Sequence, residues 1–134
     1  STESIRTYLS DKTKKLYLAQ DGYRVAKGKP EADKILDGAN CLVNNAGISL
    51  HENGFLDVYP EQFDSQFDTN LKGPFFLTQC FINRCNERGI YETKNILFTS
   101  SETSITVDER PYGLTKAAMN SLVQGLAYRY VNQG

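Results

Sequence analysis

Short apolar runs alternate along this chain with longer stretches in which apolar residues recur at helical spacing. The short runs are residues 15–19, 41–44 and 95–99, and polar or small residues typical of loops follow each one. We expect them to be β-strands, the second of them a buried parallel strand that ends in a tight turn. Strands that alternate with helices predict an α/β fold.

Two long amphipathic helices are expected after the second and third strands. The first begins at Pro60, follows a loop over residues 48–58, and is interrupted at Gly73-Pro74. The second runs from Tyr112 to near Gly134. Shorter helical segments are expected at residues 5–12 and 30–36. The residues that give the helical spacing are Phe63, Phe67, Leu71, Phe75 and Cys80 in the first long helix, and Met119, Leu122, Val123, Leu126 and Tyr130 in the second.

Composition and charge narrow the function classes. The chain has 134 residues, 40% of them hydrophobic and 23% charged, which suits one folded domain. Its formal net charge is -1 with no Lys/Arg run, so we expect neither nucleic acid nor an anionic membrane as partner. No stretch approaches the ~20 apolar residues of a membrane span, and the polar N-terminus does not resemble a signal peptide. We therefore expect a cytoplasmic protein.

Cysteine and histidine usage excludes further chemistries. Cys41, Cys80 and Cys85 form an odd set without C-x-x-C spacing, so no disulfide framework and no zinc site is expected. His51 is the only histidine, which excludes the usual serine-hydrolase triad and histidine-rich metal centres.

Tyr112 and Lys116 are the first candidates for chemistry. Their spacing places the phenol and the ammonium one turn apart on a helix face, where the positive charge favours the phenolate. The same Tyr-x-x-x-Lys spacing recurs at Tyr8 and Tyr23, so the spacing alone is not specific. Only Tyr112 opens a helix after a strand and a hydroxyl-rich loop. It is therefore expected at the carboxyl edge of the sheet, where open α/β folds bind ligands.

Two loops at that edge add further candidates. Residues 99–104 carry five hydroxyl side chains, and a serine such as Ser101 can donate a hydrogen bond to a substrate oxygen. Asn45, Ala46 and Gly47 follow the second strand, where small residues allow a ligand to approach the backbone and an amide can meet a ribose. A polar capping loop and an ordinary Asn-rich turn are the alternative interpretations.

Asn70 is a candidate because Pro74 lies four residues further on. Proline has no N–H to donate to the carbonyl of residue i−4, so the Asn70 carbonyl leaves the helical hydrogen-bond ladder and needs another partner. The alternative is a kink that only steers the helix around the core.

These four features occur in the order, and at about the distances, found in the short-chain dehydrogenase/reductase family, which the chain resembles over essentially its whole length. The resemblance implies a Rossmann-like, doubly wound parallel sheet, of which residues 1–134 form the central portion, with about three strands and flanking helices in one domain. Asn44 to Gly47 match the family's Asn-Asn-Ala-Gly motif. No GxGxxG or GxxxGxG loop occurs in the chain, and the family's N-terminal glycine-rich unit and C-terminal strands are not matched.

The resemblance assigns roles to individual residues. Tyr112 would exchange the proton, Ser101 or its neighbour Ser100 would hold the substrate oxygen, and Asn70 would bind a relay water through its backbone carbonyl. Lys116 would bind the nicotinamide ribose, and Asn44 would brace the sheet. The implied catalytic residues are Asn70, Ser101, Tyr112 and Lys116, and the implied NAD- or NADP-binding residues are Asp21, Asn45, Ala46, Gly47, Tyr112 and Lys116, with no metal.

The implied activity is hydride transfer between NAD or NADP and a carbonyl or alcohol, of the 3-oxoacyl-thioester or polyol/sugar type. The long helices would form a homodimer or homotetramer. A non-catalytic fragment or structural relic that cannot bind a dinucleotide is the alternative, favoured by the unmatched glycine loop. Because that loop normally holds the pyrophosphate, we expect residues 1–134 alone not to bind the cofactor usefully.

Overall fold

The computed structural model of the chain describes residues 40–87, 89 and 94–133. The strand expected at residues 15–19, the helical segments expected at 5–12 and 30–36, and Asp21 lie outside them. In chain order the described elements are β1 (Cys41–Asn44), the 3-10 turn η3 (Phe55–Asp57), α4 (Pro60–Phe67), the π-helical turn η4 (Asp68–Lys72), α5 (Gly73–Glu87), β2 (Asn95–Phe98), the 3-10 turn η5 (Glu102–Ser104) and α6 (Pro111–Tyr130).

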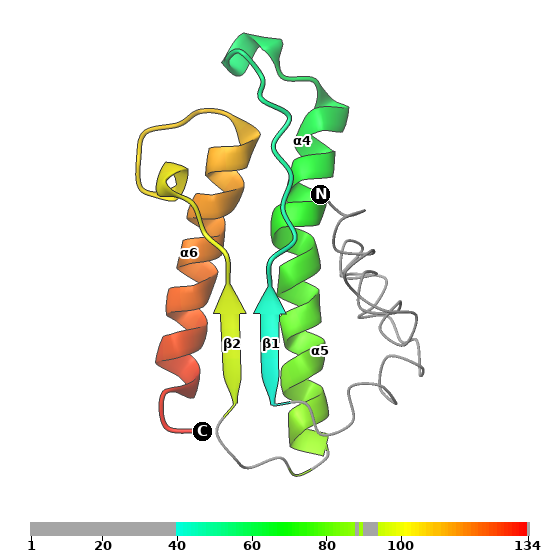
Figure 1. Ribbon diagram of the computed structural model, residues 1–134, viewed down its shortest axis with the longest axis vertical. Coiled ribbons are helices and arrows are strands. Elements are labelled where there is room, and N and C mark those ends of the chain that lie inside the picture. The colour runs from blue at the N-terminus through cyan, green and yellow to red at the C-terminus, as the bar shows by residue number, and fades with distance from the viewer. Residues whose placement is uncertain (1–39, 88, 90–93, 134) are drawn as a thin grey trace.

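The two described strands are parallel neighbours. Cys41 is paired with Asn95 and Asn44 with Phe98, and the Thr99 N–H extends the ladder by donating to the Asn44 carbonyl at 2.9 Å. Both strands point toward the end of the molecule that carries the loops leading to α4 and α6 (Figure 1). The predicted α/β arrangement with a parallel sheet is therefore confirmed, with β2 one residue shorter than expected.

The two faces of this sheet differ in burial. Asn44 is buried, and its side chain donates to Thr78 Oγ1 of α5 at 3.0 Å, which identifies the face that lies toward the helices. On the opposite face the cross-strand neighbours Val43 and Leu97 are 58% and 51% exposed. The prediction of a buried second strand is thus wrong for the described part of the chain, because the described helices cover one face only.

The helix after the loop does not break at Gly73-Pro74. α4 continues through η4 into α5 as one long rod beside β1 (Figure 1). The Gly73 N–H donates to the Asp68 carbonyl, five residues back, so the helix widens by one residue there. A π turn accommodates Pro74, which has no N–H to donate, without ending the helix. The expected interruption is therefore a local change of hydrogen bonding.

α6 begins one residue before the predicted start, with Pro111 at its first turn, and ends at Tyr130. It packs against α4 and η4, and Met119 is its buried apolar anchor at 1% exposure. Tyr128, near the far end, is 88% exposed. No helix among the described residues combines the length and apolar character that crossing a membrane requires.

Candidate active site

Lys116 occupies the centre of the site at the carboxyl edge of the sheet. It is 3% exposed, its Nζ donates to the Thr99 carbonyl at 2.9 Å, and it lies 5.7 Å from the centroid of the Tyr112 ring. Burial lowers the pKa of Lys116 from its ordinary value of 10.5, because the charged form loses hydration. The predicted tyrosine–lysine pair is therefore adjacent in space, with the ammonium anchored to the end of β2.

Gly47 brings the loop after β1 against this lysine. A Cβ built on Gly47 would lie 3.4 Å from Lys116 Nζ and 3.6 Å from Asn70 Oδ1. Gly47 itself is exposed. Three segments far apart in the sequence thus meet at a backbone surface without a side chain, as the close approach of a ligand requires.

Asn70 is fully buried and fixes the loop after β1 through its side chain. Its Oδ1 accepts from the Ile48 N–H and its Nδ2 donates to the Ile48 carbonyl, both at 2.8 Å. Nδ2 also donates to Thr115 Oγ1 at 3.1 Å, and that hydroxyl donates to the Tyr112 carbonyl at 2.7 Å. The side chain of Asn70 therefore links η4, the loop after β1 and the start of α6. The sequence pointed to Asn70 only through its backbone carbonyl, not through its side chain.

The two neighbouring asparagines brace different elements. Asn44 ties β1 to helix α5 through Thr78. Asn45 is exposed, and its Oδ1 accepts from Thr99 Oγ1 at 2.6 Å, so it links the ends of β1 and β2. Ala46 lies between Asn45 and Gly47 and is half-buried. The three predicted cofactor-binding residues thus form a continuous segment at the sheet edge.

The two candidate serines face different neighbours. Ser100 Oγ donates to Asn120 Oδ1 of α6 at 2.7 Å. Ser101 caps η5, where its Oγ accepts from the Thr103 N–H at 3.3 Å and from the Thr103 hydroxyl at 3.0 Å. Since Thr103 lines the pocket described next, Ser101 is the serine connected to that pocket through hydrogen bonds.

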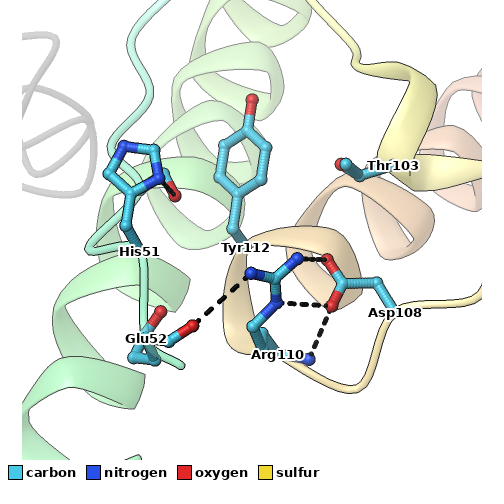
Figure 2. Close-up of a pocket in the computed structure, with 7 residues that line it drawn as sticks. His51, Glu52, Thr103, Asp108, Arg110 and Tyr112 are labelled. Carbon is cyan, nitrogen blue, oxygen red and sulfur yellow. Dashed lines mark hydrogen bonds and ion pairs between the residues drawn. The ribbon is translucent and has the colours of Figure 1, made fainter. Parts of the chain in front are cut away.

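A pocket of about 230 Å³ opens beside Tyr112. Figure 2 shows the Tyr112 ring between His51 and Thr103, with its hydroxyl at the end of the ring away from the Asp108–Arg110 pair. Each residue of its lining has a side chain that can form hydrogen bonds. The lining consists of Ser49, His51, Glu52, Thr103, Asp108, Arg110 and Tyr112.

One wall of this pocket is held by a second buried amide, Gln66, one turn before Asn70. Its Oε1 accepts from the Leu50 N–H at 3.3 Å, and its Nε2 donates to the Glu52 carboxylate. Together the two amides hold alternate loop residues 48, 50 and 52 against the helix. Ser49 and His51, between them, line the pocket, and His51 has a left-handed φ of 54°.

The opposite wall is held by an ion pair. Arg110 Nε lies 2.9 Å from Asp108 Oδ1, and the hydrogen bond from Arg110 holds the pKa of that carboxyl below its ordinary value. Arg110 Nη1 also donates to the Glu52 carbonyl at 3.4 Å, which joins the two walls (Figure 2). A Cβ on Gly113 would lie 2.6 Å from Asp108 Oδ2, so this packing requires glycine there.

The residues that shape the pocket are not among those predicted from the sequence. Gln66 precedes Asn70 by four residues, and this helical spacing was the one available signal that both amides share a face. Nothing in the sequence linked Glu52 to Arg110, 58 residues away. Among residues 40–87, 89 and 94–133, no cluster of three or more potential metal ligands is present.

Comparisons with known proteins extend over most of the chain. A family model described as enoyl-(acyl carrier protein) reductase matches residues 20–134. An uncharacterized oxidoreductase of Thermotoga maritima is 33% identical over 119 residues, which are 87% of this chain and 45% of that protein. A 3-oxoacyl-[acyl-carrier protein] reductase from Brucella melitensis has a similar structure, with a TM-score of 0.69 and 31% identity over 84% of this chain and 47% of its own. ElxO with NADP bound gives a TM-score of 0.69 at 26% identity, over 87% and 46% of the two chains.

Proposed function

Because the chain belongs to the short-chain dehydrogenase/reductase family, we propose that the protein is an NAD(P)-dependent oxidoreductase that moves hydride between the nicotinamide and a carbonyl or alcohol. The chain spans less than half the length of the relatives compared above, so the activity is proposed for the whole protein. The substrate would be either a 3-oxoacyl thioester or a polyol or sugar.

The observation that carries this proposal is the placement of Lys116 between Tyr112 and the loop after β1. Lys116 is buried and its Nζ lies 5.7 Å from the centroid of the Tyr112 ring, so the phenol and the amine lie together at the carboxyl edge of the sheet. Tyr112 therefore exchanges a proton with the substrate oxygen as general acid or base. A structural lysine in a helix would be expected to extend toward solvent, because burying its charge is costly.

Ser101 and Asn70 complete the proposed catalytic set. Among the described residues the Ser101 Oγ receives its two hydrogen bonds from Thr103, so its own hydroxyl proton is available to a substrate oxygen beside the pocket. Asn70 fixes the loop through its side chain, and we assign the relay water to its backbone carbonyl, which Pro74 cannot engage.

The residues at the sheet edge fit a dinucleotide. The Gly47 backbone presents a surface that a Cβ would fill, beside Lys116. The ammonium of Lys116 has three N–H groups, and among the described residues one acceptor is seen, the Thr99 carbonyl. Asn45, Ala46, Gly47, Tyr112 and Lys116 would hold the nicotinamide end, with Asp21 proposed for the adenine end. When bound, the nicotinamide supplies the hydride acceptor or donor.

Substitution of Tyr112 by Phe tests this function. It removes one hydroxyl, and we expect turnover to fall by about 10²–10⁴-fold with dinucleotide binding retained. Tyr128→Phe, at an exposed position on the same helix, is the matched control and should leave turnover unchanged. Near-normal turnover of Tyr112→Phe in a steady-state assay would show that the catalytic assignment is wrong.

For the whole protein we also propose a single Rossmann-like domain, a cytoplasmic location, and a homodimer or homotetramer formed through the long helices. The exposed apolar side chain of Val123 on α6 supports a subunit contact there. Light scattering that gives a monomeric mass at micromolar concentration would contradict the oligomer.

A further inference from the structure

His51 lines the pocket in a backbone conformation that side chains rarely adopt. Its φ of 54° lies in the left-handed region, and among residues 40–87, 89 and 94–133 it is the one non-glycine residue with a positive φ. A glycine would adopt this φ without steric cost, whereas a histidine there costs free energy that the surrounding contacts offset. Such conformations cluster at ligand-binding and active sites, which makes the imidazole itself of interest.

The backbone on both sides of His51 is held in place. Before it, the Leu50 N–H donates to Gln66 Oε1 at 3.3 Å. After it, the Glu52 carboxylate accepts from Gln66 Nε2, and the Glu52 carbonyl accepts from Arg110 Nη1 at 3.4 Å. Because Gln66 is fully buried, these contacts fix the loop on a rigid helix and hold the His51 side chain in one direction.

The His51 side chain extends in the same direction as that of Tyr112 (Figure 2). Glu52 and the Asp108–Arg110 pair lie at the end of the Tyr112 ring away from its hydroxyl, whereas the imidazole lies beside the ring. His51 is exposed, and both side chains line the pocket. A substrate that reacts at the Tyr112 hydroxyl therefore has the imidazole beside it.

The imidazole has capacity for a further hydrogen bond. Among the described residues its neighbour is Ser49 Oγ, 3.5 Å from Nδ1, so Nε2 has no partner there. An imidazole nitrogen donates to an oxygen or, in the other tautomer, accepts from a hydroxyl. Since Tyr112 and Ser101 are proposed to hold the reacting oxygen, the imidazole is placed for a different oxygen of the substrate.

From these observations we infer that His51 determines substrate specificity by forming a hydrogen bond with a second oxygen, one or two carbons from the reacting carbon. This inference rests on the proposed function. In a thioester substrate the second oxygen would be the thioester carbonyl, and in a polyol or sugar it would be a neighbouring hydroxyl. A substrate with carbon in place of that oxygen would take water from the imidazole without replacing its hydrogen bond, and is therefore disfavoured.

Matched ketones, reduced by the intact protein with NADH or NADPH, measure this preference. Acetoin and methyl isopropyl ketone differ by a methyl group in place of a hydroxyl, and ethyl acetoacetate and methyl pentyl ketone have chains of equal length. We expect wild type to prefer the oxygenated ketone of at least one pair in kcat/KM. His51→Phe should lower this preference by about tenfold, as loss of one hydrogen bond predicts.

Two further variants serve as comparisons for His51→Phe. His51→Gln keeps a side chain that forms hydrogen bonds, so it should retain more of the preference. Asn53→Phe, at an exposed position outside the pocket lining, should leave the preference unchanged. An unchanged preference in His51→Phe would overturn the inference while the proposed function stands.

NMR separates binding from turnover. The His51 imidazole signal, identified by its loss in His51→Gln, should shift on addition of acetoin or ethyl acetoacetate and shift less with the matched ketone that lacks the second oxygen. If it does so but no ketone is reduced, the proposed function fails and the binding inference stands. A signal that responds to none of the ketones, or equally to both members of each pair, would overturn the inference.

Stability distinguishes substrate recognition from a structural role of His51. His51→Gly relieves the left-handed φ, so its melting temperature should equal or exceed that of wild type. The same variant should lose the preference for the oxygenated ketone as fully as His51→Phe does. Retention of the preference in His51→Gly would show that the imidazole does not contact the substrate.

Discussion

The side-chain amide of Asn70 pairs with the backbone of Ile48 through two hydrogen bonds, each 2.8 Å long. This pairing resembles one rung of a β-ladder, with a buried side chain in place of a strand. It fixes the loop after β1 directly before the residues that line the pocket. Gln66 holds the next part of the loop differently: its Oε1 accepts from the Leu50 N–H and its Nε2 donates to the Glu52 carboxylate, so two buried amides fix the conformation of this loop.

Loss of the Asn70 amide should therefore destabilise the protein and the site together. In Asn70→Asp the Ile48 carbonyl and Thr115 lose their donor at a fully buried position. We expect the free energy of unfolding to fall by about 1–3 kcal/mol, because buried polar groups become unsatisfied. Urea denaturation measures this, with the exposed Asn83→Asp as control. Equal stability of both variants would contradict the role described for Asn70.

Two glycines of α6 should respond in opposite ways to alanine. At Gly113 a Cβ would lie 2.6–2.8 Å from three atoms of Asp108, so Gly113→Ala must displace that side chain and its ion pair with Arg110. At Gly125 nothing lies within 4 Å of the added Cβ. We expect Gly113→Ala to lower the melting temperature and Gly125→Ala to stabilise by about 0.5–1 kcal/mol, as alanine usually does inside a helix. Thermal denaturation followed by circular dichroism compares the two.

The Asp108–Arg110 pair should give a pH-dependent contribution to stability. The pKa of Asp108 is held below its ordinary value of 3.8, mainly by the hydrogen bond from Arg110. Its contribution is therefore present above 3.8 and is lost as the pH falls through the folded-state pKa. Asp108→Asn should be less stable than wild type at neutral pH, and the two should converge in acid. A difference in stability that does not change with pH would exclude this origin.

Lys116 should give a second contribution to stability that rises with pH, in the alkaline range. Burial lowers its pKa, so the folded protein loses this proton before the unfolded chain does. The contribution of Lys116 to stability thus rises as the pH climbs from the folded-state pKa to 10.5. Lys116→Met, which removes the buried charge, should lack this rise in alkaline denaturation experiments.

In the whole protein Lys116→Ala should weaken dinucleotide binding, because Lys116 is proposed to hold the nicotinamide end of the cofactor. Calorimetry measures this affinity. Unaltered affinity in Lys116→Ala would show that Lys116 does not hold the cofactor.

The sequence by itself determined the order of elements and most of the proposed catalytic set. Apolar runs and helical spacing located β1, β2 and the two long helices, because local periodicity reports which face of an element is buried. The spacing of Tyr112 and Lys116 predicted a pair that is indeed adjacent. It did so because both residues lie on one helix, where position along the chain fixes position in space.

Only the tertiary structure decided how distant segments meet. The contact of Arg110 with the Glu52 carbonyl spans 58 residues and that of Asn70 with Thr115 spans 45, and no local pattern records either. The same holds for the π turn before Pro74, since the sequence signals a missing N–H but not how the helix accommodates it. Chain position constrains a residue's neighbours within a helix or strand. Across the loops those neighbours are set by packing and by the need of each buried polar group for a partner.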